Sequence, residues 1–374
     1  MSNPKNSQNL YIAIFLRFLG GGGIERVLMN LAHSFTEQGI KVDLVLSQAG
    51  GPHMSRIPSA VTVVDFAAPR LSACLPDLVR YLQRQQPTVL LCAGHYTNEL
   101  ALWAKRVSGV STRIVVSEHN QLSLSAKSMG QIRRRLIPWF IRLFYPWADG
   151  IIAVSHGVAD DLAKTTGLDR KLIQVIYNPA ILPGLLEKAK EPLTHPWFAP
   201  GEPPVILGVG RLEAQKDFPT LIRAFSQVRQ IRPARLMILG WGPDQPKLEA
   251  LVKDLGLEED VSLFGYVDNP YPYMAKASVF ALSSAWEGLP TVLIEAMALG
   301  TPVVSTDCPS GAAEILNNGK YGLLTPVGDG NALAEAIVDV LDGKQKKVDP
   351  VWIEQFGLEA ATKEYCKALE LIPS

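Results

Sequence analysis

The 374-residue sequence predicts an α/β protein with two Rossmann-like domains facing a cleft. Strand-like apolar runs alternate with helical patterns along the whole chain, which indicates parallel sheets with crossover helices. The alternation restarts after residues 178–204, a segment that holds seven prolines. The length also favours two domains, since one domain typically takes about 150 residues. Ligands of such sheets bind beyond the carboxyl ends of the strands.

The first domain is expected over residues 1–180. Its predicted strands are Tyr11–Leu16, Lys41–Ser47, Thr88–Ala93, Arg113–Ser117 and Gly150–Ser155. The glycine loop Gly20–Gly23 follows the first strand and precedes a predicted helix near Ile24–Gln38. The first apolar run has only six residues, whereas a secretory signal core has about 7–15, so we expect a strand there and no leader.

Residues 181–203 are predicted to be a proline-rich linker, and residues 204–350 to form the second domain. The predicted strands of this domain are Pro204–Gly210, Arg235–Leu239, Val261–Phe264, Ser278–Leu282 and Pro302–Ser305. The predicted helices are Pro219–Gln230, Gln245–Leu255, Pro290–Leu299 and a helix near Asn331–Leu341. Residues 351–374 have helical spacing, and we expect this helix to pack back across the domain boundary.

Charge and composition exclude some functions. The chain has 36 Lys and Arg and 36 Asp and Glu, so a globally basic nucleic-acid binder is not expected. Residues 1–180 hold 19 basic and 11 acidic residues, and the remainder holds 17 and 25. The basic half is therefore the one expected to meet phosphates or an anionic membrane.

Cysteine spacing and hydropathy indicate the cellular compartment of the protein. The four cysteines lie far apart and form no metal-ligand spacing with the six histidines, which favours a reducing compartment and no structural zinc. No apolar stretch approaches the roughly 20 residues of a membrane helix. We expect a cytoplasmic protein, soluble or peripheral at the inner face of the membrane.

The loop Gly20–Gly23 is the first candidate binding element. Its amides and the following helix N-terminus suit a phosphate or a sugar, although a tight turn without a ligand explains the glycines equally well. A dinucleotide site would also need an acidic residue at the end of the second strand. That strand ends Leu46-Ser47-Gln48, with Asp43 inside it, so NAD is disfavoured.

A second candidate lies at the end of the first strand of the second domain. Arg211 and Lys216 provide a planar guanidinium and a point charge, a combination that can clamp a diphosphate. The alternative is a surface salt bridge with Glu213 or Asp217.

The segment 283–296 carries two glutamates. Glu287 lies in the predicted loop, and Pro290 is suited to the first helical position. The amides of Thr291 and Val292 would then point toward an anion. Glu295 lies among apolar residues and needs a partner, which two ribose hydroxyls or a structural ion pair would supply.

Taken together, these motifs resemble glycosyltransferase family 4, the retaining, nucleotide-sugar-dependent enzymes with the GT-B fold. The resemblance covers nearly the whole chain and is carried by Gly20–Gly23 with Glu25-Arg26, Ser117-Glu118-His119-Asn120, Ala153–Val158, Asn178-Pro179, Gly208–Arg211 with Lys216, Gly240–Pro243, Gly265-Tyr266-Val267, Glu287-x7-Glu295 and Gly300–Val304. The Glu-x7-Glu element with Arg and Lys upstream is highly specific in combination.

The resemblance implies a role for each matching residue of the second domain. Arg211 and Lys216 would bind the donor diphosphate, and Lys216 would also neutralise the leaving group. Glu287 would contact the sugar. The remaining donor-binding residues would be Glu295 on the ribose, Tyr266 and Val267 on the base, and Leu289, Thr291 and Val292 around the phosphates.

The first domain would contribute Gly22 and Gly23 to the phosphates and His119 to the transferred sugar and acceptor. One departure is notable, because many members have Glu-Gly-Phe-Gly where this chain has Glu-Gly-Leu-Pro, and Pro290 removes an amide donor. This variant resembles bacterial polysaccharide and lipid-linked glycan transferases that use UDP-hexoses or UDP-N-acetylhexosamines.

The resemblance also implies retention of configuration by a front-face mechanism, in which the leaving diphosphate takes the acceptor proton. No Asp-x-Asp occurs in the expected cleft loops, and Arg211 with Lys216 supply positive charge. We therefore expect no metal and no cofactor, with a nucleotide-sugar donor, a glycan or polyprenyl-linked acceptor, and no nucleic-acid partner.

Residues Gln131–Trp147 interleave four arginines with aromatic and aliphatic residues, a composition typical of segments at an anionic membrane surface. Burial against the first domain explains the apolar residues equally well.

Two alternatives to a retaining glycosyltransferase stay open. One is a UDP-sugar 2-epimerase of the same fold, although its signature residues do not occur in register. The other is an inactive homologue that binds a nucleotide sugar or scaffolds glycan assembly. The sequence does not name the donor sugar, the acceptor or the oligomeric state.

Overall fold

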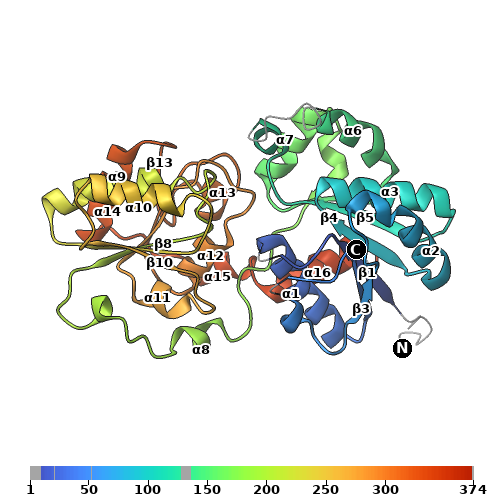
Figure 1. Ribbon diagram of the computed structural model, residues 1–374, viewed down its shortest axis with the longest axis horizontal. Helices are drawn as coiled ribbons and strands as arrows, with labels where there is room; N and C mark the ends of the chain where they lie inside the picture. The colour runs from blue at the N-terminus through green and yellow to red at the C-terminus, as the bar shows by residue number, and fades with distance from the viewer. Residues whose placement is uncertain (1–9, 21, 52, 128–135, 373–374) are drawn as a thin grey trace. The chain divides into compact units, whose positions relative to one another are not determined.

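The computed structural model describes residues 10–20, 22–51, 53–127 and 136–372 (Figure 1). The chain divides into two compact units. The first comprises Met1–Pro179 and Leu358–Ser374, and the second comprises Ala180–Gly357.

The first unit is built on a seven-stranded parallel sheet with the order β3-β2-β1-β4-β5-β6-β7. Its strands are β1 (Tyr11–Leu16), β2 (Lys41–Leu46), β3 (Thr62–Asp65), β4 (Val89–Ala93), β5 (Arg113–Glu118), β6 (Gly150–Ala153) and β7 (Ile173–Val175). Its helices include α1 (Gly23–Glu37), α2 (Leu75–Gln85), α3 (His95–Ser108), α4 (Leu122–Lys127), α6 (Ile137–Phe144), α7 (His156–Thr166) and α16 (Leu358–Ala368). Every residue of β1 is buried, because helices cover both faces of a parallel sheet.

The second unit has a six-stranded parallel sheet with the order β10-β9-β8-β11-β12-β13. Its strands are β8 (Val205–Val209), β9 (Arg235–Leu239), β10 (Val261–Gly265), β11 (Val279–Leu282), β12 (Val303–Thr306) and β13 (Leu323–Thr325). Its helices are α8 (Leu185–Ala189), α9 (Phe218–Ile231), α10 (Gln245–Asp254), α11 (Tyr271–Lys276), α12 (Thr291–Ala298), α13 (Ala312–Ile315), α14 (Gly330–Leu341) and α15 (Pro350–Glu354). Helices α9 and α14 cover one face of the sheet, and α11 lies on the other (Figure 1).

Each sheet reverses its strand order once, between β1 and β4 in the first unit and between β8 and β11 in the second. Loops that leave the carboxyl ends of strands at such a point diverge, and ligands of open α/β sheets bind there. Both units therefore have the predicted Rossmann-like topology. In the second unit, the two loops at the reversal are 210–217 and 283–290.

The proline-rich segment 181–203 packs on the second unit instead of forming a separate linker. The side-chain amide Nδ2 of Asn269 donates to the carbonyl of Lys188, at 2.9 Å. The rings of His195 and Phe264 lie 5.4 Å apart. Prolines in this segment shape a chain that follows the surface of the unit.

The C-terminal stretch is divided between the units. Helix α15 belongs to the second, where Trp352 Nε1 donates to the carbonyl of Ile315. Helix α16 belongs to the first and packs against α1, where Thr362 Oγ1 donates to Ser34 Oγ at 3.0 Å. Tyr365 and Cys366 of α16 join the core of the first unit. The chain thus passes from one unit to the other at residues 357–358.

Among the helices that the structure describes, none is both long enough and apolar enough to cross a membrane. The four cysteines are buried and form no disulfide.

Candidate active site

The centre of the candidate site is an ion pair between Lys216 and Glu287. Lys216 lies in the loop after β8 and Glu287 in the loop after β11. Lys216 Nζ is 2.5 Å from Glu287 Oε1, and the two side chains are only 17% and 7% exposed. The sequence predicts a cation and a carboxylate at the carboxyl ends of these strands, and the fold brings the two into direct contact.

Two neutral donors also hold the Glu287 carboxylate. Ser284 Oγ donates to Oε1 at 2.6 Å, and Gln215 Nε2 donates to Oε2 at 3.2 Å. Neither residue is among the site residues predicted from the sequence. Their positions gave a weak signal, because Gln215 precedes Lys216 and Ser284 lies in the same loop as Glu287.

Main-chain contacts join the two loops. The amide of Ala285 donates to the carbonyl of Gln215, and Ser283 Oγ donates to the carbonyl of Lys216, both at 2.8 Å. Asp217 adopts a left-handed conformation (φ +44°), which turns the chain from the Lys216 loop into α9. Its carboxylate accepts a hydrogen bond from Thr220 Oγ1. The geometry of the ion pair is therefore set by the backbone as well as by side chains.

Glycines make room for the Lys216 side chain. A Cβ at Gly210 would lie 2.9 Å from Lys216 Cε, closer than side-chain packing allows. Gly240 has φ +141°, and a Cβ there would lie 1.9 Å from the Gly210 carbonyl oxygen. These glycines let the lysine stem lie flat on the end of β8.

Arg211 is placed differently from Lys216. It follows β8 as predicted, but its side chain is 59% exposed and forms an ion pair with Glu213. This pair is the surface salt bridge that the sequence left open as the alternative. Among the described residues, Arg211 forms no ion pair with Glu287 or Glu295, the two glutamates of the Glu-x7-Glu element.

Glu295 lies inside α12 and is 1% exposed. The hydroxyl of Tyr271, from α11, donates to its Oε1 at 3.4 Å. A tyrosine hydroxyl is thus one partner of Glu295, whereas the sequence suggested ribose hydroxyls or a structural ion pair.

Helix α12 begins at Thr291, and Pro290 is its N-cap, one position earlier than the sequence analysis placed it. The first helical hydrogen bond of this turn runs from the amide of Leu293 to the carbonyl of Pro290, at 3.1 Å. The amides of Thr291 and Val292 precede that bond, and both residues are partly exposed, whereas Leu289 is buried. Helix amides that precede the first intrahelical hydrogen bond are the ones that can bind an anion.

The base-binding candidates follow β10 directly. Tyr266 is 60% exposed and Val267 is partly exposed. Their place at the carboxyl end of a strand of the same sheet fits the predicted position.

In the first unit, His119 immediately follows β5 and is 5% exposed. Its Nε2 lies 3.1 Å from Ser117 Oγ, which itself donates to the carbonyl of Cys92 at 2.9 Å. Ser117 therefore accepts from a protonated Nε2, and Nδ1 carries the lone pair. Burial lowers the pKa of His119 to about 4, so the ring is neutral. Nδ1 has no hydrogen-bond partner among the described residues.

Glu118, at the end of β5, is a buried carboxyl to which the sequence analysis gave no role. It accepts hydrogen bonds from the Tyr145 hydroxyl and from Asn98 Nδ2, the latter at 3.0 Å. Burial raises its pKa to about 7, although both hydrogen bonds act in the opposite direction. Glu99, on α3, also has a pKa raised to about 7, by burial and by the charge of Glu118.

Gly22 and Gly23 of the first loop are not required to be glycine by their own backbone conformation or by their packing. Neither Gly22 nor Gly23 has a positive φ. A Cβ at Gly23 would meet nothing within 4 Å, and one at Gly22 would crowd only the flexible carboxylate of Glu25. A tight turn without a ligand therefore does not explain why these two positions are glycine.

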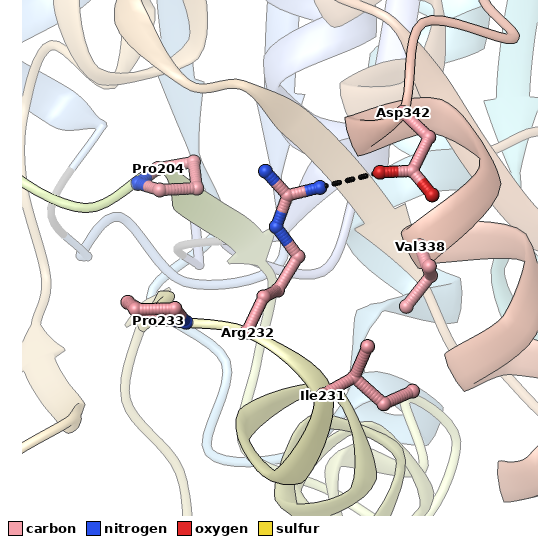
Figure 2. A pocket seen from close by; sticks show the side chains of 6 residues that line it. All are labelled: Pro204, Ile231, Arg232, Pro233, Val338 and Asp342. Atoms are coloured by element: carbon pink, nitrogen blue, oxygen red, sulfur yellow. Dashed lines mark hydrogen bonds and ion pairs between the residues drawn. The ribbon is translucent and has the colours of Figure 1, made fainter.

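The pocket in Figure 2 lies at the end of the second sheet opposite to the Lys216–Glu287 site. It is lined by Pro204, Ile231, Arg232, Pro233, Val338 and Asp342, and Arg232 pairs with Asp342 at 2.7 Å. Pro204 precedes β8, and Ile231 ends α9, so this hollow faces the amino ends of the strands. It is separate from the Lys216–Glu287 site.

Solved structures place this architecture in a known class. The chain is similar to Anabaena Alr3699/HepE in complex with UDP and glucose, with a TM-score of 0.78 and 20% identity, covering 96% of this chain and 99% of that one. It is also similar to the lipopolysaccharide outer core galactosyltransferase WaaB, with a TM-score of 0.72 and 24% identity, covering 96% and 99%. Two parallel-sheet units of this kind define the GT-B fold.

Sequence comparisons show the family. Residues 21–181 match Glycosyltransferase Family 4, and residues 203–343 match Glycosyl transferases group 1. The chain is 33% identical over 349 residues to the N-acetylgalactosamine-N,N'-diacetylbacillosaminyl-diphospho-undecaprenol 4-alpha-N-acetylgalactosaminyltransferase of Campylobacter jejuni, covering 90% of this chain and 92% of that protein. The chain belongs to glycosyltransferase family 4 and is a glycosyltransferase, so the epimerase alternative falls.

Proposed function

We propose that this glycosyltransferase moves a hexose or N-acetylhexosamine from a UDP-sugar to a lipid-linked glycan acceptor, with retention of configuration. The observation that carries the proposal is the buried Lys216–Glu287 pair at the strand-order reversal of the second unit. The names of two similar proteins support the donor and acceptor classes, since one binds UDP and glucose and the other acts on a diphospho-undecaprenol acceptor.

In this proposal, the bond between the anomeric carbon and the diphosphate breaks as the acceptor oxygen bonds to the same face of that carbon. The acceptor proton passes to the departing phosphate oxygen. Lys216 supplies positive charge to the leaving group, with the Thr291 and Val292 amides beside it and Arg211 turning from Glu213. Glu287 holds the sugar, and the Nδ1 lone pair of His119 accepts a hydrogen bond from a hydroxyl of the bound sugar.

The test is a ligand screen followed by product analysis. UDP- and GDP-linked hexoses and N-acetylhexosamines are compared for their effect on the melting temperature, which rises for any ligand that prefers the folded state. The best donor is then used for transfer to a short polyprenyl-diphosphate glycan, and NMR of the new linkage reports its configuration. Stabilisation by a UDP-sugar with α-to-α transfer supports the proposal. Stabilisation without transfer would favour the inactive sugar-binding alternative.

We further propose that the first unit docks on an anionic bilayer through a surface on α3 and α6. This surface exposes five large apolar side chains, 42–60% accessible: Trp103, Val107, Leu136, Trp139 and Leu143. The guanidinium of Arg106 lies 5.0 Å from the centre of the Trp147 ring beside it. Aromatic and basic residues together suit the headgroup region. Of the four arginines in Gln131–Trp147, Arg133, Arg134 and Arg135 lie outside the described residues.

Vesicle flotation tests this contact. Trp139→Glu with Leu143→Glu is expected to reduce binding to phosphatidylglycerol vesicles at least tenfold, because two charges would enter the interface. Leu172→Glu is a matched control, since Leu172 is 59% exposed on the same unit but outside the surface. Unchanged flotation of the double variant would contradict the proposal.

A further inference from the structure

The Glu287 carboxylate has more hydrogen-bond donors than its ion pair requires. Its Oε1 receives Lys216 Nζ at 2.5 Å and Ser284 Oγ at 2.6 Å, and its Oε2 receives Gln215 Nε2 at 3.2 Å. A carboxylate oxygen accepts about two hydrogen bonds. Among the described residues, both sites on Oε1 are thus filled and one site on Oε2 remains.

Lys216 is the charged donor of this arrangement and has the longest side chain of the three. Its ammonium is a point charge on a flexible stem, and it can turn toward a second anion. Under the proposed function, on which this inference rests, a donor diphosphate brings that anion to the carboxyl end of β8. The two neutral donors, in contrast, are anchored: Gln215 by its carbonyl to the amide of Ala285, and Ser284 by its carbonyl to Thr306 Oγ1 at 2.6 Å.

We propose that Gln215 and Ser284 are positioning residues that hold Glu287 in place when Lys216 transfers from Glu287 to the donor diphosphate. Departure of Lys216 opens one acceptor site on Oε1 beside the open site on Oε2. The carboxylate can then accept from two neighbouring groups of the sugar, such as two hydroxyls. Without the neutral donors, a carboxylate on a side chain that is only 7% exposed would lose its orientation as its counter-charge leaves.

The arrangement makes sugar recognition dependent on the diphosphate. A sugar that arrives without a diphosphate meets a carboxylate whose Oε1 is already occupied. A UDP-sugar frees that oxygen as it binds. The device would favour the intact donor over the free sugar at the same site.

The experiment compares Gln215→Met and Ser284→Ala with wild type. Methionine keeps the length of glutamine but donates no hydrogen bond. Gln245→Met is the matched control, because Gln245 Nε2 also donates to a carboxylate, Glu249 Oε1 at 2.9 Å, on exposed α10. For each protein, the kcat and KM for the best UDP-sugar and the Kd for UDP are measured.

We expect Gln215→Met to lower kcat/KM for the UDP-sugar by about 10- to 100-fold, a loss typical of a hydrogen bond to a charged group. The Kd for UDP, which has no sugar, should stay within about twofold, since Lys216 and the backbone are retained. Ser284→Ala should show the same loss of kcat/KM and the same Kd for UDP. Gln245→Met should match wild type in both quantities.

A parallel weakening of UDP binding would overturn the proposal, because it would show that the substitution distorts the whole loop. Unchanged kcat/KM in both site variants would overturn it as well. If wild type itself turns over no UDP-sugar, the proposed function fails instead, so the two failures are distinguishable.

Discussion

The Lys216–Glu287 pair illustrates how one contact can serve both folding and chemistry. Both side chains are largely buried, and a buried charge is costly when its partner is removed. Replacing both members of a buried ion pair by neutral groups is, in contrast, often close to neutral for stability. Stability and activity should therefore respond differently to substitution.

A double-mutant cycle tests this separation. Lys216→Met should lower the free energy of unfolding by about 2–4 kcal/mol, because Glu287 stays buried without a cation. Adding Glu287→Gln should restore most of that loss while the protein remains inactive. Denaturant unfolding and a UDP-release assay give the two readouts. Additive losses of stability would show that the charges do not interact.

Glu118 predicts a pH dependence of stability in the first unit. Burial raises its pKa from 4.5 to about 7 in the folded protein. Between these values the folded state binds more protons at this carboxyl than the unfolded state does. The free energy of unfolding contributed by Glu118 therefore falls as the pH rises from about 4.5 to 7.

Glu118→Gln keeps an acceptor for Tyr145 and Asn98 but removes the titration. We expect its melting temperature to match wild type at pH 5 and to exceed it by about 3–6 °C at pH 8. His119 titrates in the opposite sense but is present in both proteins, whereas the part of the raised Glu99 pKa that comes from the Glu118 charge is lost in the variant and adds to the expected difference. A difference that stays constant with pH would rule out a raised Glu118 pKa.

At the scale of elements, the start of α1 is a place where a residue needed for the fold can be distinguished from one needed for ligand binding. Gly23 is the first residue of the helix, and a Cβ at this position would meet nothing within 4 Å. Nothing in the described part of the fold therefore requires glycine at this position.

Gly23→Ala should leave the free energy of unfolding unchanged or raise it by up to about 1 kcal/mol, because alanine restricts the unfolded chain. Transfer activity should nevertheless fall at least tenfold, since the methyl group blocks a close approach of the phosphates. Gly330→Ala is the matched control, because Gly330 also begins a helix, α14, with only ordinary contacts near a Cβ. Full activity of Gly23→Ala would remove this loop from the donor site.

The missed strands are instructive about what the sequence can predict. β1 and β9 have the predicted bounds, because long buried runs stand out from their flanks. β3, β7 and β13 were not predicted, and all three are edge strands of three or four residues. An edge strand is partly exposed and short, so its apolar pattern is weak.

At the scale of the whole molecule, α16 completes a unit whose other elements lie at the opposite end of the chain. Tyr365 is fully buried in the core of the first unit. Its hydroxyl has no hydrogen-bond partner among the described residues. The ring, and not the hydroxyl, should therefore account for its contribution.

Tyr365→Ala should destabilise the first unit by about 3–5 kcal/mol, and Tyr365→Phe should be neutral or slightly stabilising. Hydrogen exchange followed by mass spectrometry locates the effect. Faster exchange is expected in β1, β2 and α1, with β8 and β9 unchanged. Equal acceleration in both units would contradict the division of the chain at residues 357–358.

The candidate site was predictable only in part. Lys216, Glu287 and the start of α12 follow from strand ends and helix signals in the sequence. The hydrogen bond from Gln215 to Glu287 does not, because the partners are 72 positions apart and Gln215 belongs to no distinctive motif. The choice of Arg211 between a substrate and Glu213 likewise depends on side-chain geometry, which local sequence does not encode.

The most direct measurement of the central claim is the rate of sugar transfer from the best UDP-sugar in the presence of EDTA, for wild type and Glu287→Gln. The account predicts transfer by wild type that EDTA leaves unchanged, since Lys216, Arg211 and a helix N-terminus supply the positive potential. It predicts a loss of about 100-fold or more in Glu287→Gln, comparable to loss of other charge-stabilising groups in active sites. Equal rates in the two proteins, or abolition of wild-type transfer by EDTA, would contradict it.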